Sequence, residues 1–213
     1  MNYIRSLPPA ASIAKLYTVR LALRILDQYG CQRILDVGCG DAYFEETFPD
    51  RFVGLDIEPQ RLAQAGRRGI QRLVLGSGEY LPCADGQFDG LLAKDVLEHL
   101  YLEQAFRFLY EVRRVLRPGG IFITVTSKSV QSFWDKPDHV RPYSNKWVRR
   151  VMTHEMARDS TPGGASFDVI LERELSAGIP GFGRLGLEAL AHALAQHLGI
   201  RNDHGLIVLR KTS

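Results

Sequence analysis

The alternation of short apolar runs with helical patterns constrains the fold of this chain most. Each run has four to six residues, too few for a buried helix, and nearly all are apolar, so both faces of each strand must be covered. This pattern predicts an α/β fold, a doubly wound, mostly parallel seven-stranded sheet with helices on both faces. The runs lie at residues 33–37, 52–56, 72–75, 88–93, 121–126, 167–171 and 205–209.

Composition and charge exclude several classes of protein. The apolar fraction of 45% and the charged fraction of 24% are those of a globular protein. The 27 basic and 24 acidic residues give a net charge of only +3, so nucleic acid is not an expected partner. Basic doublets at residues 67–68, 113–114 and 149–150 are expected on solvated helix faces.

The first residues lack the layout of a secretory signal, and no apolar run is long enough to cross a bilayer. Cys31, Cys39 and Cys83 are scattered and odd in number, which predicts neither a disulfide framework nor a zinc site. A cytoplasmic location is therefore expected. The 213 residues are expected to form one domain, 1–213, because no linker or repeat interrupts them.

The first apolar run ends in a glycine turn, Gly38-Cys-Gly40, preceded by Asp36. In an open α/β sheet, ligands bind at the carboxyl ends of the strands, and glycine lets the backbone come within contact distance of them. Asp56 ends the next run, where a carboxylate can accept hydrogen bonds from a ribose diol. Together these residues predict a ligand that contains adenosine.

The absence of two phosphate-binding motifs from the sequence restricts the class of ligand further. A dinucleotide fingerprint needs a third glycine where this chain has Tyr43, and the acidic Asp41 beside the turn would repel a pyrophosphate. A phosphate-binding loop is excluded because the chain has no Gly-Lys-Ser or Gly-Lys-Thr step. An adenosine ligand with a cationic centre and no phosphate fits this turn better.

Six motifs in this order and spacing resemble the class I methyltransferases that use S-adenosylmethionine, in particular the small-molecule methyltransferase group. They are ILDVGCG at 34–40, GLDI at 54–57, EYLP at 79–82, FD at 88–89, LEHL at 97–100 and LRPGG at 116–120. The resemblance implies a Rossmann-like fold, S-adenosylmethionine as cofactor, and methyl transfer to a small-molecule, sugar or lipid-like acceptor, with oxygen as the expected acceptor atom.

The resemblance also implies which residues contact the cofactor, within a cofactor-binding part at about residues 30–126. Asp36, Gly38 and Gly40 would surround its amino-acid part, and Asp56 its ribose. Ile57 would lie against adenine and the backbone of Lys94 beside the methionine end. Similar proteins usually carry an acidic residue for adenine where this chain has Ser77-Gly78-Glu79, so adenine recognition would depend on Ser77 and on backbone groups near Gly78 and Glu79.

Acceptor-binding elements are expected at about residues 127–165 and 174–203. If the acceptor is a hydroxyl, a base is needed, and His139 is the candidate, with Arg141 and Tyr143 in the same loop as acceptor contacts. His139 and Arg141 could instead only hold the loop in place. Phe182, between two glycines, is a candidate acceptor lid. The other histidines show no metal-ligand spacing, so no metal is expected.

Three alternatives remain open. An RNA or protein acceptor would call for a basic extension, or for an amino-methylation signature that residues 127–131 do not contain. A non-catalytic, cofactor-binding subunit would also carry this fold, although the intact acidic and glycine positions disfavour it. An NAD-dependent oxidoreductase is disfavoured by Tyr43. Transient contact with a membrane is compatible with a lipid-like acceptor, and the sequence assigns no oligomeric state.

Overall fold

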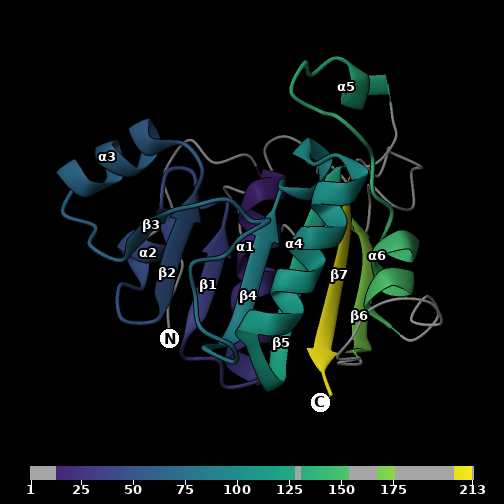
Figure 1. Cartoon of the computed structure of the whole chain (residues 1–213), viewed down its shortest axis with the longest axis horizontal. Coiled ribbons are helices and arrows are strands. Elements are labelled where there is room, and N and C mark those ends of the chain that lie inside the picture. Colours follow the sequence, from purple (N-terminus) through teal and green to yellow (C-terminus); the bar gives the residue numbers. More distant parts are fainter. Residues whose placement is uncertain (1–12, 128–130, 154–166, 176–203, 213) are drawn as a thin grey trace.

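The computed structural model describes residues 13–127, 131–153, 167–175 and 204–212, and Figure 1 shows their arrangement. Seven strands form one sheet in the order β3-β2-β1-β4-β5-β7-β6. This sheet confirms the predicted doubly wound fold. The strands are β1 (Ile34–Val37), β2 (Phe52–Asp56), β3 (Leu73–Leu75), β4 (Phe88–Lys94), β5 (Leu116–Ser127), β6 (Phe167–Leu175) and β7 (His204–Lys211).

The first five strands are parallel, whereas β7 runs antiparallel to both β5 and β6. The chain moves outward from β1 to β2 and β3, then returns to place β4 on the other side of β1. This reversal is the topological switch point, where ligands of doubly wound sheets bind. The carboxyl ends of the parallel strands form the upper edge of the sheet in Figure 1.

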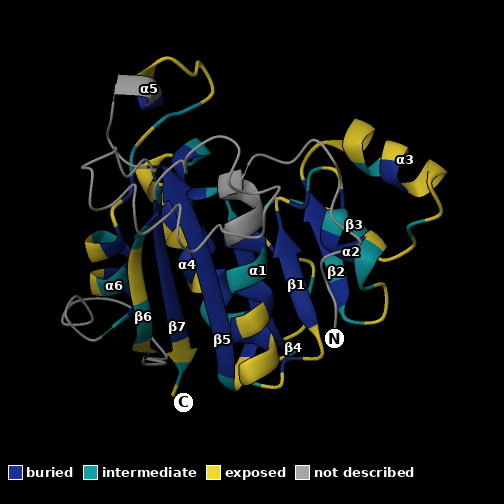
Figure 2. Cartoon of the chain, turned by 180° about the vertical axis from the view of Figure 1, so that it is seen from behind, coloured by how far each residue is buried: buried dark blue, intermediate teal, exposed yellow. Residues whose placement is uncertain are grey.

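Helices cover both faces of the sheet. In Figure 1, α4 and α6 lie in front of it, and Figure 2 shows α1 on the opposite face and most strands buried. Two apolar clusters result, one on each face. None of the described helices is long and apolar enough to cross a membrane. The helices are α1 (Ile13–Gln28), α2 (Tyr43–Thr47), α3 (Pro59–Arg67), the 3-10 helix η2 (Leu97–His99), α4 (Leu102–Val115), α5 (Gln131–Trp134) and α6 (Asn145–Met152).

β5 begins earlier than the sequence predicts. The Pro118-Gly-Gly120 step reads as a turn between a helix and a strand, yet the strand already starts at Leu116. Phe88 of β4 pairs with Leu116, and two residues later Gly90 pairs with Ile121, so β5 contains the turn residues as an irregularity within the ladder. A turn signal therefore need not end a strand when a partner strand continues on both sides of it.

The Arg113–Arg114 doublet does not lie on a solvated helix face, which corrects the prediction from charge patterning. Arg114 donates hydrogen bonds to the carbonyls of Leu81 and Cys83, at 2.9 and 2.6 Å, and binds the Glu111 carboxylate at 2.7 and 2.8 Å. Arg113 donates to the carbonyl of Val151. Both guanidinium groups therefore connect α4 to segments that are distant in sequence, Arg114 to the loop at residues 81–83 and Arg113 to α6.

Candidate active site

The glycine turn after β1 requires glycine at both predicted positions. Gly38 and Gly40 have φ values of 73° and 55°, in the left-handed region that side chains disfavour. A Cβ atom on Gly38 would lie 2.7 Å from Cγ2 of Val96, closer than side-chain atoms pack. The turn therefore brings bare backbone to the switch point between β1 and β4.

Asp56, at the end of β2, holds this turn in place. Its carboxylate accepts hydrogen bonds from the backbone amides of Gly40, at 2.8 Å, and Glu58, at 2.9 Å. An ionised carboxylate offers about four acceptor positions, so two remain for a ribose diol. Ile57 follows with 67% of its surface exposed, which leaves an apolar side chain open beside the ribose position.

A second carboxyl group, which the sequence did not reveal as part of the site, lies under the glycine turn. Glu45 in α2 is only 1% exposed, and burial raises its pKa to about 7. Burial and the neighbouring Glu45 also raise the pKa of Asp36 well above its usual range, although the Lys94 ammonium opposes this shift. We call Asp36, Glu45 and Asp56 the acidic floor; burial favours the protonated forms of Asp36 and Glu45, and a cation bound above them would favour their ionised forms.

The segment Ser77-Gly78-Glu79 forms a tight turn beside the site. The Ser77 hydroxyl accepts a hydrogen bond from the backbone amide of Glu79, at 3.2 Å. The carboxylate of Glu79 faces α4 instead, where Gln104 donates to it at 2.7 Å and Arg107 lies 3.5 Å away. Gly78 packs closely against α4. The Glu79 carboxylate is therefore engaged by α4, and only main-chain groups of the turn remain for the predicted contact with adenine.

The end of β4 is strained. Asp95 has a φ of 56°, unusual for a residue with a side chain, and its amide donates to the Val125 carbonyl at 2.9 Å. Its carboxylate pairs with the ammonium of Lys94 and lies 3.7 Å from Nε2 of His204. Asp95 does not cap the 3-10 helix that follows, because Val96 is the residue that precedes η2.

Glu98 fixes the acceptor-side loop to the strand ends. Its side chain is fully buried, and its carboxylate accepts a hydrogen bond from the Ser127 amide at 3.0 Å. Its backbone carbonyl accepts from the amides of Val140, at 2.8 Å, and Arg141, at 3.2 Å. Burial raises the pKa of this carboxyl group. The loop with the predicted base is thus anchored beside the end of β5.

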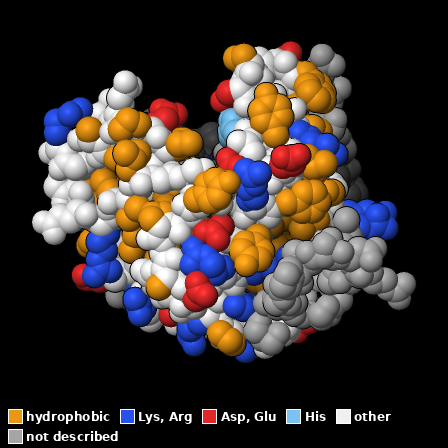
Figure 3. Space-filling model, viewed as in Figure 1, with side chains coloured by type: hydrophobic (Ala, Val, Ile, Leu, Met, Phe, Trp, Pro, Cys, Tyr) orange, Lys and Arg blue, Asp and Glu red, His pale blue; other side chains and the backbone are white. Residues whose placement is uncertain are grey.

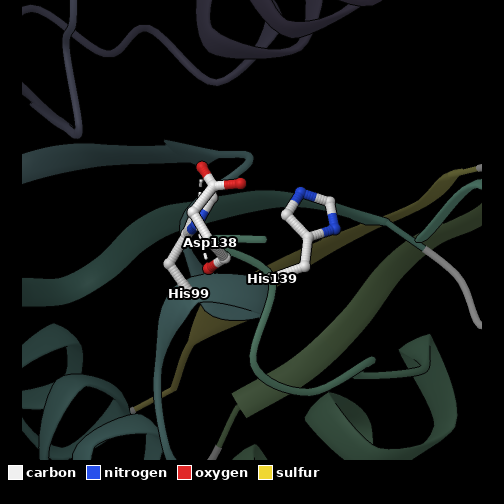
Figure 4. A group of neighbouring side chains, drawn as sticks. All are labelled: His99, Asp138 and His139. Atoms are coloured by element: carbon white, nitrogen blue, oxygen red, sulfur yellow. Dashed lines mark hydrogen bonds and ion pairs between the residues drawn. The ribbon is translucent and has the colours of Figure 1, made fainter. Parts of the chain in front are cut away.

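His139 lies beside Asp138 of the same loop and beside His99 at the end of η2, as Figure 4 shows. The rings of His99 and His139 meet edge to face, with centroids 5.0 Å apart. Nδ1 of His99 lies 2.9 Å from the Asp138 carbonyl and 3.5 Å from its carboxylate. Burial, followed by the Lys136 ammonium, lowers the pKa of His139, which favours the neutral imidazole.

These three residues are the one group in the described part of the chain whose ligand atoms could jointly hold a metal ion. The sequence predicted no metal site, because His99 is 39 positions from Asp138 and no spacing rule connects them. Figure 3 shows a notch between the α3 and α5 sides of the upper edge, with a histidine side chain on its wall.

The remaining predicted acceptor residues differ in their surroundings. Arg141 is exposed, with its guanidinium 5.8 Å from the centroid of the Tyr143 ring. Tyr143 is only 1% exposed, and its hydroxyl donates to the Leu100 carbonyl at 2.9 Å, a geometry that favours holding the loop over touching an acceptor. Phe182 lies outside the described residues, as does most of the predicted acceptor-binding part.

Known proteins resemble this chain in sequence. Residues 35–124 match the methyltransferase domain family. The chain is 39% identical over 99 residues to an uncharacterized methyltransferase of Mycobacteroides abscessus, covering 42% of this chain and 38% of that protein. It is 34% identical over 128 residues to a probable S-adenosylmethionine-dependent methyltransferase of Mycolicibacterium smegmatis, covering 58% and 49%. The chain thus spans less than half the length of these two relatives.

Solved structures show the same fold. A SAM-dependent methyltransferase from Archaeoglobus fulgidus matches with a TM-score of 0.62 and 18% identity, over 93% of this chain and 94% of that one. The N-methyltransferase NodS from Bradyrhizobium japonicum, solved with S-adenosyl-L-homocysteine, matches with a TM-score of 0.64 and 16% identity, over 94% and 88%. Residues 35–124 therefore resemble a methyltransferase domain in sequence, and the chain has the fold of the class I S-adenosylmethionine-dependent methyltransferases.

Proposed function

We propose that this chain transfers the methyl group of S-adenosylmethionine to a small-molecule, sugar or lipid-like acceptor, at oxygen. The observation that carries the proposal is the hydrogen bond between the Asp56 carboxylate and the Gly40 amide at the switch point. This hydrogen bond joins the end of β2, which would contact the ribose, to the turn after β1, which would contact the amino-acid part of the cofactor. The acidic floor below them suits a cofactor with a cationic centre.

When bound, S-adenosylmethionine supplies an electrophilic methyl group on a sulfonium. Asp56 and the backbone of the turn would hold the ribose, and Ile57 the adenine. Asp36, Gly38, Gly40 and the backbone of Lys94 would surround the methionine part, while the Ser77–Glu79 turn would border the adenine. Because the displacement proceeds in line and disperses positive charge, alignment in a dry pocket is the main task of the protein.

His139 would take the proton of the acceptor hydroxyl. The loop that carries it is fixed to η2 through the Glu98 carbonyl, and its ring packs 4.6 Å from that of Phe133. This packing keeps one orientation of the imidazole at the carboxyl edge of the sheet. Arg141, exposed in the same loop, would contact the acceptor, and Tyr143 would keep the loop in position.

The test is His139→Ala, assayed in single turnover with a labelled methyl group and a panel of hydroxylated metabolites and lipids. We expect cofactor affinity to be unchanged and the methyl-transfer rate to fall about 100-fold or more. The matched control is His204→Ala, which removes a histidine near the same edge without touching the loop. A small rate loss in His139→Ala would contradict the role of a base.

The same assay separates the alternatives. Transfer to RNA or to protein in place of the metabolites would reassign the acceptor, and cofactor binding without any transfer would indicate a non-catalytic subunit. For an apolar acceptor, we expect Phe182→Ala to raise the apparent KM with little change in cofactor affinity or melting temperature. A lower melting temperature with normal kinetics would instead place Phe182 in the core.

A further inference from the structure

We infer that His99, Asp138 and His139 form a binding site for one Zn²⁺-class ion on the acceptor side of the chain. One potential ligand atom from each residue lies within 4.8 Å of the other two. Figure 4 shows that the three side chains converge from two segments, His99 from the end of η2 and the other two from the loop after α5. Two imidazoles and a carboxylate are a common ligand set for such ions.

The tautomer of the His99 imidazole is fixed by a hydrogen bond. Its Nδ1 lies 2.9 Å from the Asp138 carbonyl, and a carbonyl can only accept, so this nitrogen carries the proton. The other ring nitrogen, Nε2, then keeps its lone pair free for a metal. Metal-bound histidines typically have such a second hydrogen bond, which fixes the tautomer and the direction of the ring.

His139 also offers a nitrogen without another task. Its Nδ1 has no hydrogen-bond partner among the described residues, so its lone pair is not used by a protein donor. The Lys136 ammonium nearby opposes a cation, whereas the Asp138 and Asp95 carboxylates favour it. Ring contacts with Phe133 and His99 support the imidazole on two sides.

The loop is held firmly enough for a site but leaves room for an ion to enter. The Glu98 carbonyl accepts from the amides of Val140 and Arg141, which ties the loop to the helix that ends at His99. Asp138 is exposed and can turn toward the histidines. Ligand atoms about 2.0–2.2 Å from a tetrahedral metal lie roughly 3.3–3.6 Å apart, so separations of up to 4.8 Å must shorten by up to about 1.5 Å.

The ligand set selects the class of ion. Imidazole nitrogen suits Zn²⁺ and its transition-metal neighbours, whereas Mg²⁺ and Ca²⁺ prefer oxygen ligands. Three protein ligands leave the fourth position of a tetrahedral ion open to water. A ligated His139 cannot accept a proton through the bound nitrogen. Zn²⁺ should therefore inhibit methyl transfer, an expectation that rests on the function proposed above.

The test uses the full chain without a histidine tag, freed of metal by a chelator and titrated with Zn²⁺ by calorimetry. We expect one ion per chain, no heat with Mg²⁺, and visible absorption bands when Co²⁺ replaces Zn²⁺. His99→Ala and Asp138→Asn should each weaken binding about 10-fold or more. His204→Ala is the matched control, with unchanged affinity, because His204 lies near Asp95 but outside the trio.

Absence of Zn²⁺ binding, or equal affinity in wild type and His99→Ala, would overturn the site. This measurement needs no acceptor and no turnover, so it stands even if the proposed function fails. Where an acceptor is in hand, Zn²⁺ should abolish transfer in the wild type at a concentration that leaves most of the activity of Asp138→Asn, measured against the rate of that variant without Zn²⁺. Equal inhibition of both proteins would show that the ion acts elsewhere and contradict the inference.

Discussion

The Asp56 carboxylate and the Gly40 amide are joined by a hydrogen bond of 2.8 Å, which connects the end of β2 to the glycine turn after β1. The same carboxylate accepts from the Glu58 amide, so it also fixes the start of α3. A single side chain thus sets the relative position of two strand ends and of the helix beside them. The turn is held in shape by residues that would also bind the ligand.

Gly38→Ala should lower the free energy of unfolding by about 2–4 kcal/mol. The substitution forces a side chain into the left-handed region at φ 73° and places Cβ 2.7 Å from Cγ2 of Val96. Chemical denaturation measures the loss. Gly66→Ala, in α3, is the matched control and should stabilise by about 0.5–1 kcal/mol, because nothing lies near its Cβ position. Similar effects of both substitutions would contradict this reading of the turn.

Glu45 should make stability depend on pH. Burial raises its pKa from 4.5 to about 7, so the folded chain keeps a proton that the unfolded chain releases in this interval. The stabilisation is fully present below about pH 4.5 and is lost as the pH rises through about 7, a change of up to about 3 kcal/mol. Glu45→Gln should therefore gain stability relative to wild type between pH 5 and pH 8.

Denaturation curves at pH 5 and pH 8 measure the difference in stability between Glu45→Gln and the wild type. Glu46→Gln, an exposed neighbour in the same helix, is the control and should leave the pH dependence as in the wild type. Parallel pH profiles for wild type and Glu45→Gln would show that the buried carboxyl group is ionised in the folded chain or reaches solvent.

Arg114→Ala should destabilise the chain by about 2–3 kcal/mol. The guanidinium satisfies the carbonyls of Leu81 and Cys83 and the Glu111 carboxylate, and its side chain is only 24% exposed. Arg107→Ala, on the same helix with its side chain 52% exposed, should cost about 0–1 kcal/mol. Urea denaturation measures the free energy of unfolding of both variants. Equal losses of stability would mean that the Arg114 contacts contribute little.

Local pattern was enough to predict the sheet and the ligand-facing strand ends. Gly38, Gly40 and Asp56 are recognisable because glycine and acid positions follow apolar runs, and the order of elements brings those ends to one edge. Contacts between distant segments could not be predicted in this way. Arg114 reads as a solvated charge until the loop at residues 81–85 folds over it, and His99 is unremarkable until Glu98 binds the loop of His139.

Two left-handed backbone positions could not be predicted from the sequence either. Ala42 and Asp95 have φ values of 55° and 56°; alanine gives no signal of a left-handed position, and aspartate is enriched there but far more often lies elsewhere. The burial of Glu45 follows from the side chains around it, although a glutamate close to Phe44 and Phe48 in a short helix was a weak sequence signal. The acidic floor of the site therefore emerged only with the fold.

Calorimetry of S-adenosylmethionine binding tests the cofactor site most directly. We predict that the wild-type chain binds S-adenosylmethionine without added metal and that Asp56→Ala weakens binding about 10- to 150-fold, the equivalent of about 1.5–3 kcal/mol for a hydrogen bond to a charged group. Asp50→Ala, at an exposed aspartate, controls for the loss of charge, and melting curves confirm that each variant is folded. Equal affinity in wild type and a folded Asp56→Ala, or tight binding of NAD in place of S-adenosylmethionine, would contradict the assignment.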